Sequence, residues 1–334
     1  MTKAITLYSG GLDSLLAANL LSRQGIDVIA VNFKTPFFGV DESACKRFAQ
    51  IGIPLHIIDI GEEYYTEILK KPQYGYGKNL NPCIDCHGFM LKKAGDYMEK
   101  VGASFLSTGE VLGERPMSQN KNSLKIVENL SGYAGYIVRP LSALLLEPTI
   151  PEINGWVDRG QLLDLSGRSR ARQFELARKW GITDYPTPAG GCRLTDANFS
   201  RRLQRVLDLN DSLDLPAVEI LKLGRHFALD PNTLLIVGRN HAENLAIENL
   251  ARSDDLLIKV ADHPGPSAIL RVQNPRSDFS GDFDCQIIDF SAAIVARYSD
   301  AKNQAQAQVQ LIKGGSVELI YIEPLTPEQT PASL

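Results

Sequence analysis

The chain has 334 residues, enough for two domains or one large one, and its 44% hydrophobic and 22% charged residues are typical of a soluble globular protein. No apolar run approaches the roughly 20 residues that cross a bilayer, and the N-terminus lacks the basic and apolar regions of an export signal. The formal net charge of −4 neither requires nor excludes a nucleic-acid partner. Five cysteines in a chain of this size indicate a reduced, cytoplasmic compartment rather than a disulfide framework.

The first half of the chain alternates strand and helix signals. Strands are expected at residues 3–8, 27–33, 55–60 and 104–107. Helices are expected at residues 13–23, 42–50, 64–70 and 87–101. This alternation predicts an α/β fold with a doubly wound parallel sheet. Ligands of such sheets bind beyond the carboxyl ends of the strands.

The segment Ser9-Gly10-Gly11-Leu12-Asp13-Ser14 joins the first expected strand to the first expected helix. Its two glycines let the backbone approach a ligand, and the helix start leaves N–H groups free to bind phosphate. It is neither a GxxxxGK[ST] loop, since no Lys follows, nor a GxGxxG turn. An ordinary strand–helix turn with Ser and Asp caps is the alternative.

Three cysteines form a second constellation. Asn81-Pro82-Cys83-Ile84-Asp85-Cys86 precedes a helix expected to begin near His87, whose N-terminus would favour thiolates. Cys192 lies far along the chain, after Pro188-Ala189-Gly190-Gly191, whose glycines would let its sulfur approach the pair. Cys45 and Cys285 have no partner in the sequence and are expected to be small buried hydrophobes.

Three interpretations of these thiols are open. Cys83, Cys86 and Cys192 would hold a [4Fe–4S] cluster with one iron open to an exogenous ligand. They would instead hold structural zinc, with His87 as a fourth ligand. In the third interpretation one cysteine carries a persulfide that another resolves.

The middle of the chain is basic. Between residues 159 and 205 ten Lys and Arg stand against four acids, Asp164, Glu175, Asp184 and Asp196. The ten basic residues are Arg159, Arg168, Arg170, Arg172, Arg178, Lys179, Arg193, Arg201, Arg202 and Arg205. The run is either a solvated helix face or a patch for RNA phosphates.

The last third has a different pattern. Short strands are expected at residues 234–237, 256–260, 268–272 and 317–322, and helices at 242–251 and 291–299. They indicate a smaller α+β module. The predicted organisation is a nucleotide-binding domain at 1–165, a basic connecting region carrying Cys192 at 166–212, the α+β module at 213–325 and a frayed tail at 326–334.

The glycine turn resembles the pyrophosphate loop (PP-loop) of the N-type ATP pyrophosphatases, whose domains have the adenine nucleotide alpha hydrolase-like fold. Residues 107–119, with Thr108-Gly109-Glu110, Leu112-Gly113 and Ser118-Gln119, and the later Arg139-Pro140-Leu141 look like the catalytic domain of tRNA 4-thiouridine synthetases. The Asn-Pro-Cys-x-x-Cys segment recurs in tRNA thiolases, including those that make 2-thiouridine. The resemblance covers roughly residues 1–200.

This resemblance implies roles for individual residues. It implies that ATP phosphates, with Mg²⁺, are bound by Ser9, Gly10, Gly11, Asp13 and Ser14. Asn32 and Phe33 would lie by the nucleotide, Gly109 and Glu110 would border the adenosine pocket, and Ser118 and Gln119 the reacting end. Cys83, Cys86 and Cys192 match the cysteines of cluster-dependent thiolases, with Asp13 counted among the catalytic residues.

Residues 213–325 resemble the RNA-binding domain of the NFACT family. The resemblance rests on Val237-Gly238-Arg239-Asn240, Asp254-Asp255-Leu256 and Pro264-Gly265-Pro266. Leu257, Ile258 and Lys259 stand where that family has an aromatic–His pair. We see neither the N-terminal RNA-binding extension of many 4-thiouridine synthetases nor a C-terminal rhodanese segment in this sequence. Because a rhodanese segment would carry the sulfur, we expect free sulfide or another sulfur donor instead.

The resulting hypothesis is a cytoplasmic tRNA sulfurtransferase that adenylates a uracil carbonyl, releases pyrophosphate and AMP, and inserts sulfur through the cluster, with 4-thiouridine favoured over 2-thiouridine. A persulfide thiolase without a cluster and an amide-forming adenylating synthetase are the alternatives. An RNA-binding protein with an inactive nucleotide loop is a third.

Overall fold

The computed structural model describes residues 2–40, 43–185, 191–210, 213–273 and 283–334. Glu42 of one expected helix and residues 188–190 before Cys192 lie outside these ranges. The chain divides into two compact units, Met1–Asp196 and Ala197–Leu334. The expected basic connecting region is therefore split between the two units.

The first unit is built on a sheet of five parallel strands in the order β3-β2-β1-β4-β5. The strands are β1 (Lys3–Leu7), β2 (Asp27–Lys34), β3 (Leu55–Asp59), β4 (Phe105–Thr108) and β5 (Ile137–Val138). Pairing of Ile5 with Ile29 on one side and with Leu106 on the other puts β1 at the centre. The strand order reverses between β1 and β4, so the expected doubly wound topology is confirmed.

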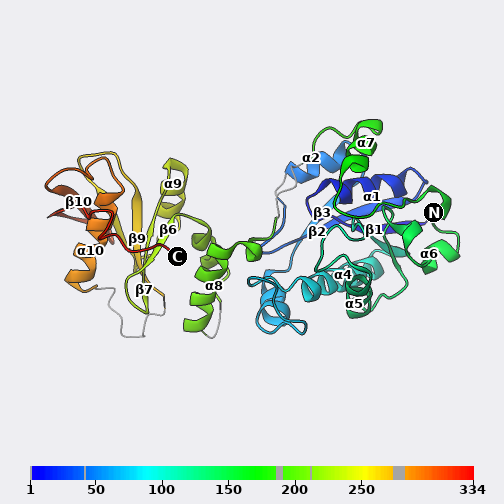
Figure 1. The fold of residues 1–334 in the computed structure, drawn as a ribbon, viewed down its shortest axis with the longest axis horizontal. Helices are drawn as coiled ribbons and strands as arrows, with labels where there is room; N and C mark the ends of the chain where they lie inside the picture. Colours follow the sequence, from blue (N-terminus) through cyan, green and yellow to red (C-terminus); the bar gives the residue numbers. More distant parts are fainter. Residues whose placement is uncertain (1, 41–42, 186–190, 211–212, 274–282) are drawn as a thin grey trace. The chain divides into compact units, whose positions relative to one another are not determined.

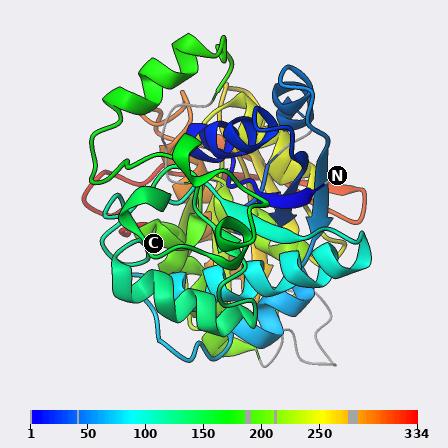
Figure 2. The same cartoon turned by 90° about the vertical axis from the view of Figure 1, so that its right-hand side faces the viewer.

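Helices cover both faces of this sheet, and Figure 1 shows α1, α2 and α7 on one face and α4 and α5 on the other. Their bounds are α1 (Leu12–Ser22), α2 (Ser43–Ala49), α3 (Gly61–Tyr64), α4 (Cys83–Lys100), α5 (Lys121–Ser131), α6 (Ile150–Ile153) and α7 (Ala171–Lys179). Figure 2 shows α4 and α5 side by side beneath the sheet. The sandwich buries Leu15 and Leu21 of α1 with Phe48 of α2 and Phe105 of β4.

Two helix predictions need correction. The helix expected near His87 begins four residues earlier, at Cys83, with Pro82 as its N-cap. Proline suits the start of a helix because it has no N–H to leave unpaired. The helix expected at residues 64–70 is a short α-helix, α3, that continues as a π-helical turn, Tyr65–Leu69. Helix α7 was not predicted, because its sequence was read only as part of the basic run.

The second unit is a six-stranded antiparallel sheet in the order β11-β10-β8-β9-β7-β6. Its strands are β6 (Arg225–Ala228), β7 (Thr233–Val237), β8 (Leu256–Val260), β9 (Ser267–Val272), β10 (Ala307–Lys313) and β11 (Ser316–Ile322). Its helices are α8 (Ala197–Leu209), α9 (His241–Asn249) and α10 (Cys285–Arg297). The expected smaller α+β module is confirmed.

Each face of the second sheet is held differently. Ile294 of α10 lies in one apolar core with Ile258 of β8 and Leu270 of β9. Because side chains alternate along a strand, Lys259 and Ser267 face the other side, where both contact Glu248 of α9. The module therefore has a helix on each face.

The chain's last residues, expected to fray, are tied to the second unit. The Leu334 N–H donates to the His226 carbonyl at 2.9 Å, and the Leu334 carbonyl accepts from Arg202 at 3.2 Å. Among the described residues, no helix has the length and apolarity needed to cross a membrane.

Candidate active site

The glycine turn leaves the carboxyl end of β1 and opens α1. Gly10 has a φ of 91°, which residues with a Cβ rarely adopt. The Ser14 hydroxyl donates to the Gly11 carbonyl at 3.0 Å and accepts the Ser9 N–H at 3.4 Å, so it closes the loop from within. The free N–H groups at the start of α1 form the positive end of the helix dipole, which favours binding of an anion.

Gly109 follows β4, on the other side of the point where strand order reverses. A Cβ at Gly109 would stand 2.4 Å from the Ser14 backbone nitrogen, closer than real side chains come. Only glycine therefore allows the segment after β4 to pack against the glycine turn. The two segments meet at the switch point, where open α/β sheets bind ligands.

A cavity of about 220 Å³ opens beside this turn. Ten expected site residues border it: Ser9, Asp13, Asn32, Phe33, Cys83, Cys86, Gly109, Glu110, Gln119 and Cys192. Within the described residues, Gly10, Gly11, Ser14 and Ser118 are not on its wall. Ser118 is 3% exposed and buried elsewhere. The structure thus brings the glycine turn and all three expected thiols to one cavity.

The three thiols reach the cavity from two segments. Cys83 and Cys86 lie in the first turn of α4. Cys192 is carried by a segment held at two points. The Arg193 N–H donates to the Phe37 carbonyl at 2.8 Å, and the Asn79 side chain donates to the Thr195 carbonyl at 2.7 Å. These bonds tie the third cysteine to the loops that follow β2 and precede α4.

The expected thiolate character of the pair is wrong for Cys86. Burial, and then the neighbouring Cys192 and Cys83, raise the pKa of the Cys86 thiol far above its usual range. Burial also raises the pKa of Cys192, to about 11. Desolvation therefore outweighs the helix N-terminus. Both thiols stay protonated at neutral pH unless a cationic group binds beside them.

The other cysteines are exposed, so the expectation that they are buried hydrophobes is wrong: Cys45 lies on α2 and Cys285 begins α10. Within the described part of the chain, no three His, Cys, Asp or Glu side chains are grouped closely enough to hold a metal ion. His87, the candidate fourth zinc ligand, places Nδ1 3.0 Å from the Glu110 carboxylate. The zinc interpretation gains no support from this arrangement.

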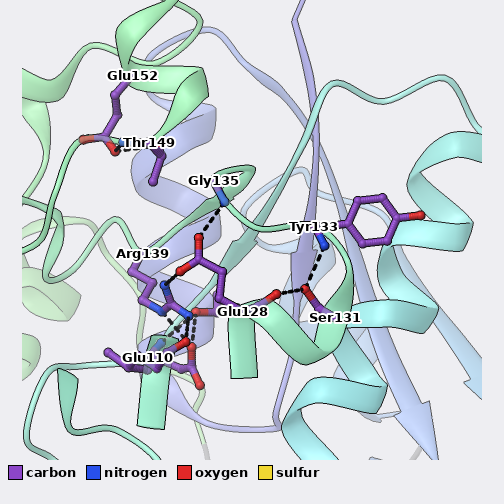
Figure 3. A network of polar contacts seen from close by, with 10 residues as sticks. Glu110, Glu128, Ser131, Tyr133, Gly135, Arg139, Thr149 and Glu152 are labelled. Carbon is purple, nitrogen blue, oxygen red and sulfur yellow. Dashed lines mark hydrogen bonds and ion pairs between the residues drawn. The ribbon is translucent and has the colours of Figure 1, made fainter. Parts of the chain in front are cut away.

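Glu110 belongs to a buried ionic network behind the cavity wall (Figure 3). Its carboxylate accepts from Arg139 Nε at 3.0 Å, and Arg139 also lies 3.6 Å from Glu128. Burial alone would raise the pKa of Glu110, but the Arg139 guanidinium and the His87 hydrogen bond lower it to about 2. The Glu128 carboxylate in turn accepts the Gly135 N–H at 2.7 Å. This network fixes the wall on which Glu110 and His87 lie.

Two further predicted residues hold loops around the cavity. The Asn32 amide donates to the Tyr8 carbonyl at 2.7 Å and accepts the Val40 N–H at 3.2 Å. The Gln119 side chain accepts the Arg115 N–H at 3.1 Å. These side chains shape the site through the backbone around it.

Sequence reasoning missed one close partner of the glycine turn. Arg170 donates to Asp13 at 3.0 Å, across 157 residues of sequence. Burial raises the pKa of Asp13, and Arg170 opposes that shift without cancelling it. In the sequence, the only signal for this role of Arg170 is its position within the basic run.

Part of the basic run is engaged in contacts within each unit. Several of its arginines are engaged inside their own unit: Arg159 with Glu152, Arg170 with Asp13, Arg172 with Asp164, and Arg205 with the Asp230 carbonyl. Arg202 is 9% exposed and donates to the Leu221 carbonyl at 3.1 Å. The patch for RNA phosphates therefore stays a prediction, with these five arginines already engaged in contacts of their own.

A parallel sheet with a glycine turn at its switch point has the fold of the PP-loop class of nucleotide-binding domains. Residues 2–142 match the family model described as the tRNA methyl transferase HUP domain. Residues 224–333 match the NFACT protein RNA binding domain. Both domain resemblances inferred from the sequence are thereby confirmed.

Two curated relatives align with different shares of the chain. A Listeria monocytogenes protein named tRNA-specific 2-thiouridylase MnmA is 24% identical over 361 aligned residues, which cover 98% of this chain and 90% of the relative. The protein of that name from Clostridium acetobutylicum is 36% identical over 133 residues, 32% of this chain and 35% of the relative. The chain is therefore similar over nearly its whole length to a relative named as a tRNA thiolase, and residues 224–333 match an NFACT-type RNA-binding domain.

Among solved structures, the U34-tRNA thiolase NcsA from Methanococcus maripaludis, described with its [4Fe–4S] cluster, is 18% identical. The structural alignment covers 62% of this chain and 65% of the NcsA chain, and the TM-score is 0.33. A likeness of that size carries no argument about the site.

Proposed function

We propose that this protein is an ATP-dependent tRNA sulfurtransferase that replaces a carbonyl oxygen of uridine with sulfur. The observation that carries the proposal is the shared cavity: the phosphate-binding turn and three thiols, from residues 83, 86 and 192, border one space. An adenylating site alone would need no thiols, so the amide-forming alternative leaves them without a role. The names of the relatives support tRNA as the substrate.

The chemistry has two steps. The uracil oxygen attacks the α-phosphorus of ATP, and pyrophosphate leaves with the electron pair of the broken P–O bond. A hydrosulfide sulfur then adds to the activated ring carbon, and AMP leaves with the former carbonyl oxygen. In the persulfide alternative the outer sulfur adds instead, and a second cavity thiol then attacks the inner sulfur, so that the S–S bond breaks, the thiolated nucleoside leaves and a Cys–Cys disulfide remains for a thiol reductant to reopen. Both steps depend on positioning and charge neutralisation more than on covalent help from the protein.

The chain's own groups supply that positioning. Ser9, Gly10, Gly11 and Ser14 form the turn whose backbone N–H groups would hold the phosphates, with Asp13 facing the magnesium ion that accompanies ATP. The adenosine would lie against Asn32, Phe33, Gly109 and Glu110. Gln119 borders the same cavity near the reacting end, whereas Ser118 would act only through the backbone.

Cys83, Cys86 and Cys192 are the kind and number of ligands that a [4Fe–4S] cluster with one open iron takes, and all three border one cavity. Within the described residues their side chains are not grouped closely enough to hold a metal ion as they lie, so a cluster would require them to move together. When bound there, a cluster with one open iron would supply a Lewis acid that keeps a sulfur ligand deprotonated. Burial raises the pKa of Cys86 and Cys192, so their thiols would have to lose protons as the cluster binds. A persulfide on Cys86 or Cys192 is the alternative that the same cavity accommodates.

Carbon 2 of the uracil is the proposed position, because relatives that align with 98% of the chain are named 2-thiouridylases. The motif resemblance favoured carbon 4 instead, and the two products are separated by the nucleoside analysis below. The tRNA would be held partly by the second unit, whose family match is an RNA-binding domain.

The test combines the purified full-length protein with unmodified tRNA, Mg·ATP and sulfide under anaerobic conditions. Mass spectrometry and ultraviolet spectra of the digested nucleosides would identify 2-thiouridine or 4-thiouridine, and AMP release would follow adenylation. Cys86→Ser and Cys192→Ser should lose thiolation, whereas Cys45→Ser, which alters an exposed cysteine of the same unit, should retain it. Thiolation that survives loss of all three cavity cysteines would refute the proposal.

The cluster and the persulfide are told apart by the same protein. A brown colour and iron content that disappear in Cys83→Ser, with loss of activity in air, would support the cluster. A colourless, iron-free protein that is active with a persulfide donor but inactive with sulfide would support the persulfide. Binding of tRNA should weaken as salt rises, since phosphate contacts release counterions. An affinity independent of salt would exclude electrostatic capture of the tRNA backbone.

A further inference from the structure

Two carboxylates and one arginine lie together beside the glycine turn. Arg170 Nη2 lies 3.0 Å from Asp13 Oδ2, and Arg170 Nε lies 3.9 Å from Glu114 Oε1. The three side chains are 15–19% exposed. Asp13 and Glu114 also border the cavity. The arginine thus lies at the phosphate end of the proposed nucleotide site.

Packing holds Arg170 in this position. It is the N-cap residue of α7, and Ala177 of that helix lies in one apolar core with Leu12 and Leu16 of α1. The guanidinium also lies 5.7 Å from the Phe174 ring. The helix that carries the arginine is therefore packed on the helix that the glycine turn opens.

The pair is incompletely satisfied. Among the described residues, Asp13 Oδ1 and Arg170 Nε are buried and have no hydrogen-bond partner. Leaving such atoms unpaired in a folded protein is destabilising, so they are rare without a function. The two atoms belong to a paired carboxylate and guanidinium, of which Asp13 lines the cavity. An oxygen that lacks a cation and an N–H that lacks an acceptor match a ligand that carries both: a metal-bound polyphosphate.

We propose that Arg170 contacts the β- and γ-phosphates of Mg·ATP and neutralises pyrophosphate as it leaves, while Asp13 Oδ1 faces the accompanying magnesium ion. The inference rests on the proposed function and names a residue for its first step. When the bond between the α-phosphorus and its bridging oxygen breaks, the electron pair stays on the pyrophosphate oxygen. The Arg170 Nε–H then donates to the pyrophosphate, where that charge develops.

The geometry separates arginine from lysine at this position. Nη2 is used by Asp13, so a second donor of the same fork must reach the phosphates. A lysine ammonium keeps the charge but lacks the planar fork that serves both partners at once. Arg170→Lys should therefore keep the ion pair with Asp13 but lose the preference for ATP over AMP.

The experiment compares the full-length wild type with Arg170→Ala, Arg170→Lys and the control Arg172→Ala. Arg172, two residues away, pairs with Asp164 at 2.7 Å, and both side chains are more than half exposed. Affinities for Mg·ATP and for AMP are measured by calorimetric titration, and tRNA-dependent AMP release gives kcat. Melting temperatures identify any variant that fails to fold, in which case Arg170→Lys gives the result.

Both Arg170 variants should lose at least about tenfold in the preference for ATP over AMP, the size of one charge-assisted hydrogen bond. They should lose about 100-fold in kcat. Arg172→Ala should match the wild type in both. An unchanged ATP-to-AMP preference in folded Arg170 variants would overturn the inference. A wild type that selects ATP without thiolating tRNA would instead overturn the proposed function, because the binding ratio needs no thiolation.

Discussion

Neutralising Glu110 should destabilise the first unit in a pH-dependent way. The side chain is 9% exposed and faces Arg139, which is 5% exposed. In Glu110→Gln the shape and most hydrogen bonds remain, but the charge that balances the guanidinium is lost. Arg139 then keeps only the Glu128 carboxylate, 3.6 Å away, as a counter-ion, and a buried charge that is poorly compensated is destabilising.

The magnitude follows from the pKa. Burial works against ionisation of Glu110, yet Arg139 and His87 lower its pKa from the ordinary 4.5 to about 2. A group with a depressed pKa stabilises the fold fully above its unfolded value and loses that contribution as pH falls toward the folded value. The shift corresponds to roughly 3 kcal/mol at pH 7, and to roughly 2 kcal/mol at pH 3.5.

Urea unfolding of the full-length protein, followed by tryptophan fluorescence, measures this difference. Both tryptophans, Trp156 and Trp180, belong to the first unit, so the signal reports that unit alone. Asp164→Asn, which breaks an exposed pair, is the control and should not shift the midpoint measurably. Equal midpoints for wild type and Glu110→Gln at pH 7, or a difference that does not narrow at pH 3.5, would refute the reasoning.

Two further outcomes are expected. Gly109→Ala should lower the melting temperature and abolish ATP binding, because its Cβ would lie 2.4 Å from the Ser14 backbone. Gly11→Ala should melt like the wild type, because the nearest contact of its Cβ is at 3.8 Å. Calorimetry of the two variants measures this difference. Arg271→Met should destabilise the second unit by about 3–5 kcal/mol, since its partner Asp255 is almost fully buried. Circular dichroism should show that loss while the tryptophan transition stays in place.

Local sequence patterns predicted most of the first unit. Apolar runs of strand length separated by helical periodicity gave β1 to β4 within a residue or two, because buried parallel strands must be apolar. The start of α4 was misplaced, since Cys-Ile-Asp-Cys has no helical pattern and its helix depends on Pro82 and packing. The helices α7 and α8 were not predicted, because the arginines of this stretch were interpreted as a charged surface and the helical spacing of the apolar residues between them was not used.

The parts of the candidate site that lie within one short stretch of sequence were predictable. The glycine turn and the paired cysteines have fixed spacings that fold into predictable local geometry. Arg170 had no such signal, because its partner Asp13 is 157 residues away and the contact depends on how α7 packs. The protonated state of Cys86 was equally invisible, since the burial that raises its pKa comes from the tertiary structure.

The location of Cys192 also sets an order of assembly. This thiol lies four residues before the end of the first unit, while the turn it faces begins at residue 9. During synthesis the nucleotide loop and the paired cysteines therefore leave the ribosome long before the third sulfur does. Whatever is loaded onto the three thiols can be captured only once nearly two hundred residues have emerged, so maturation of the site follows completion of the domain rather than accompanying it.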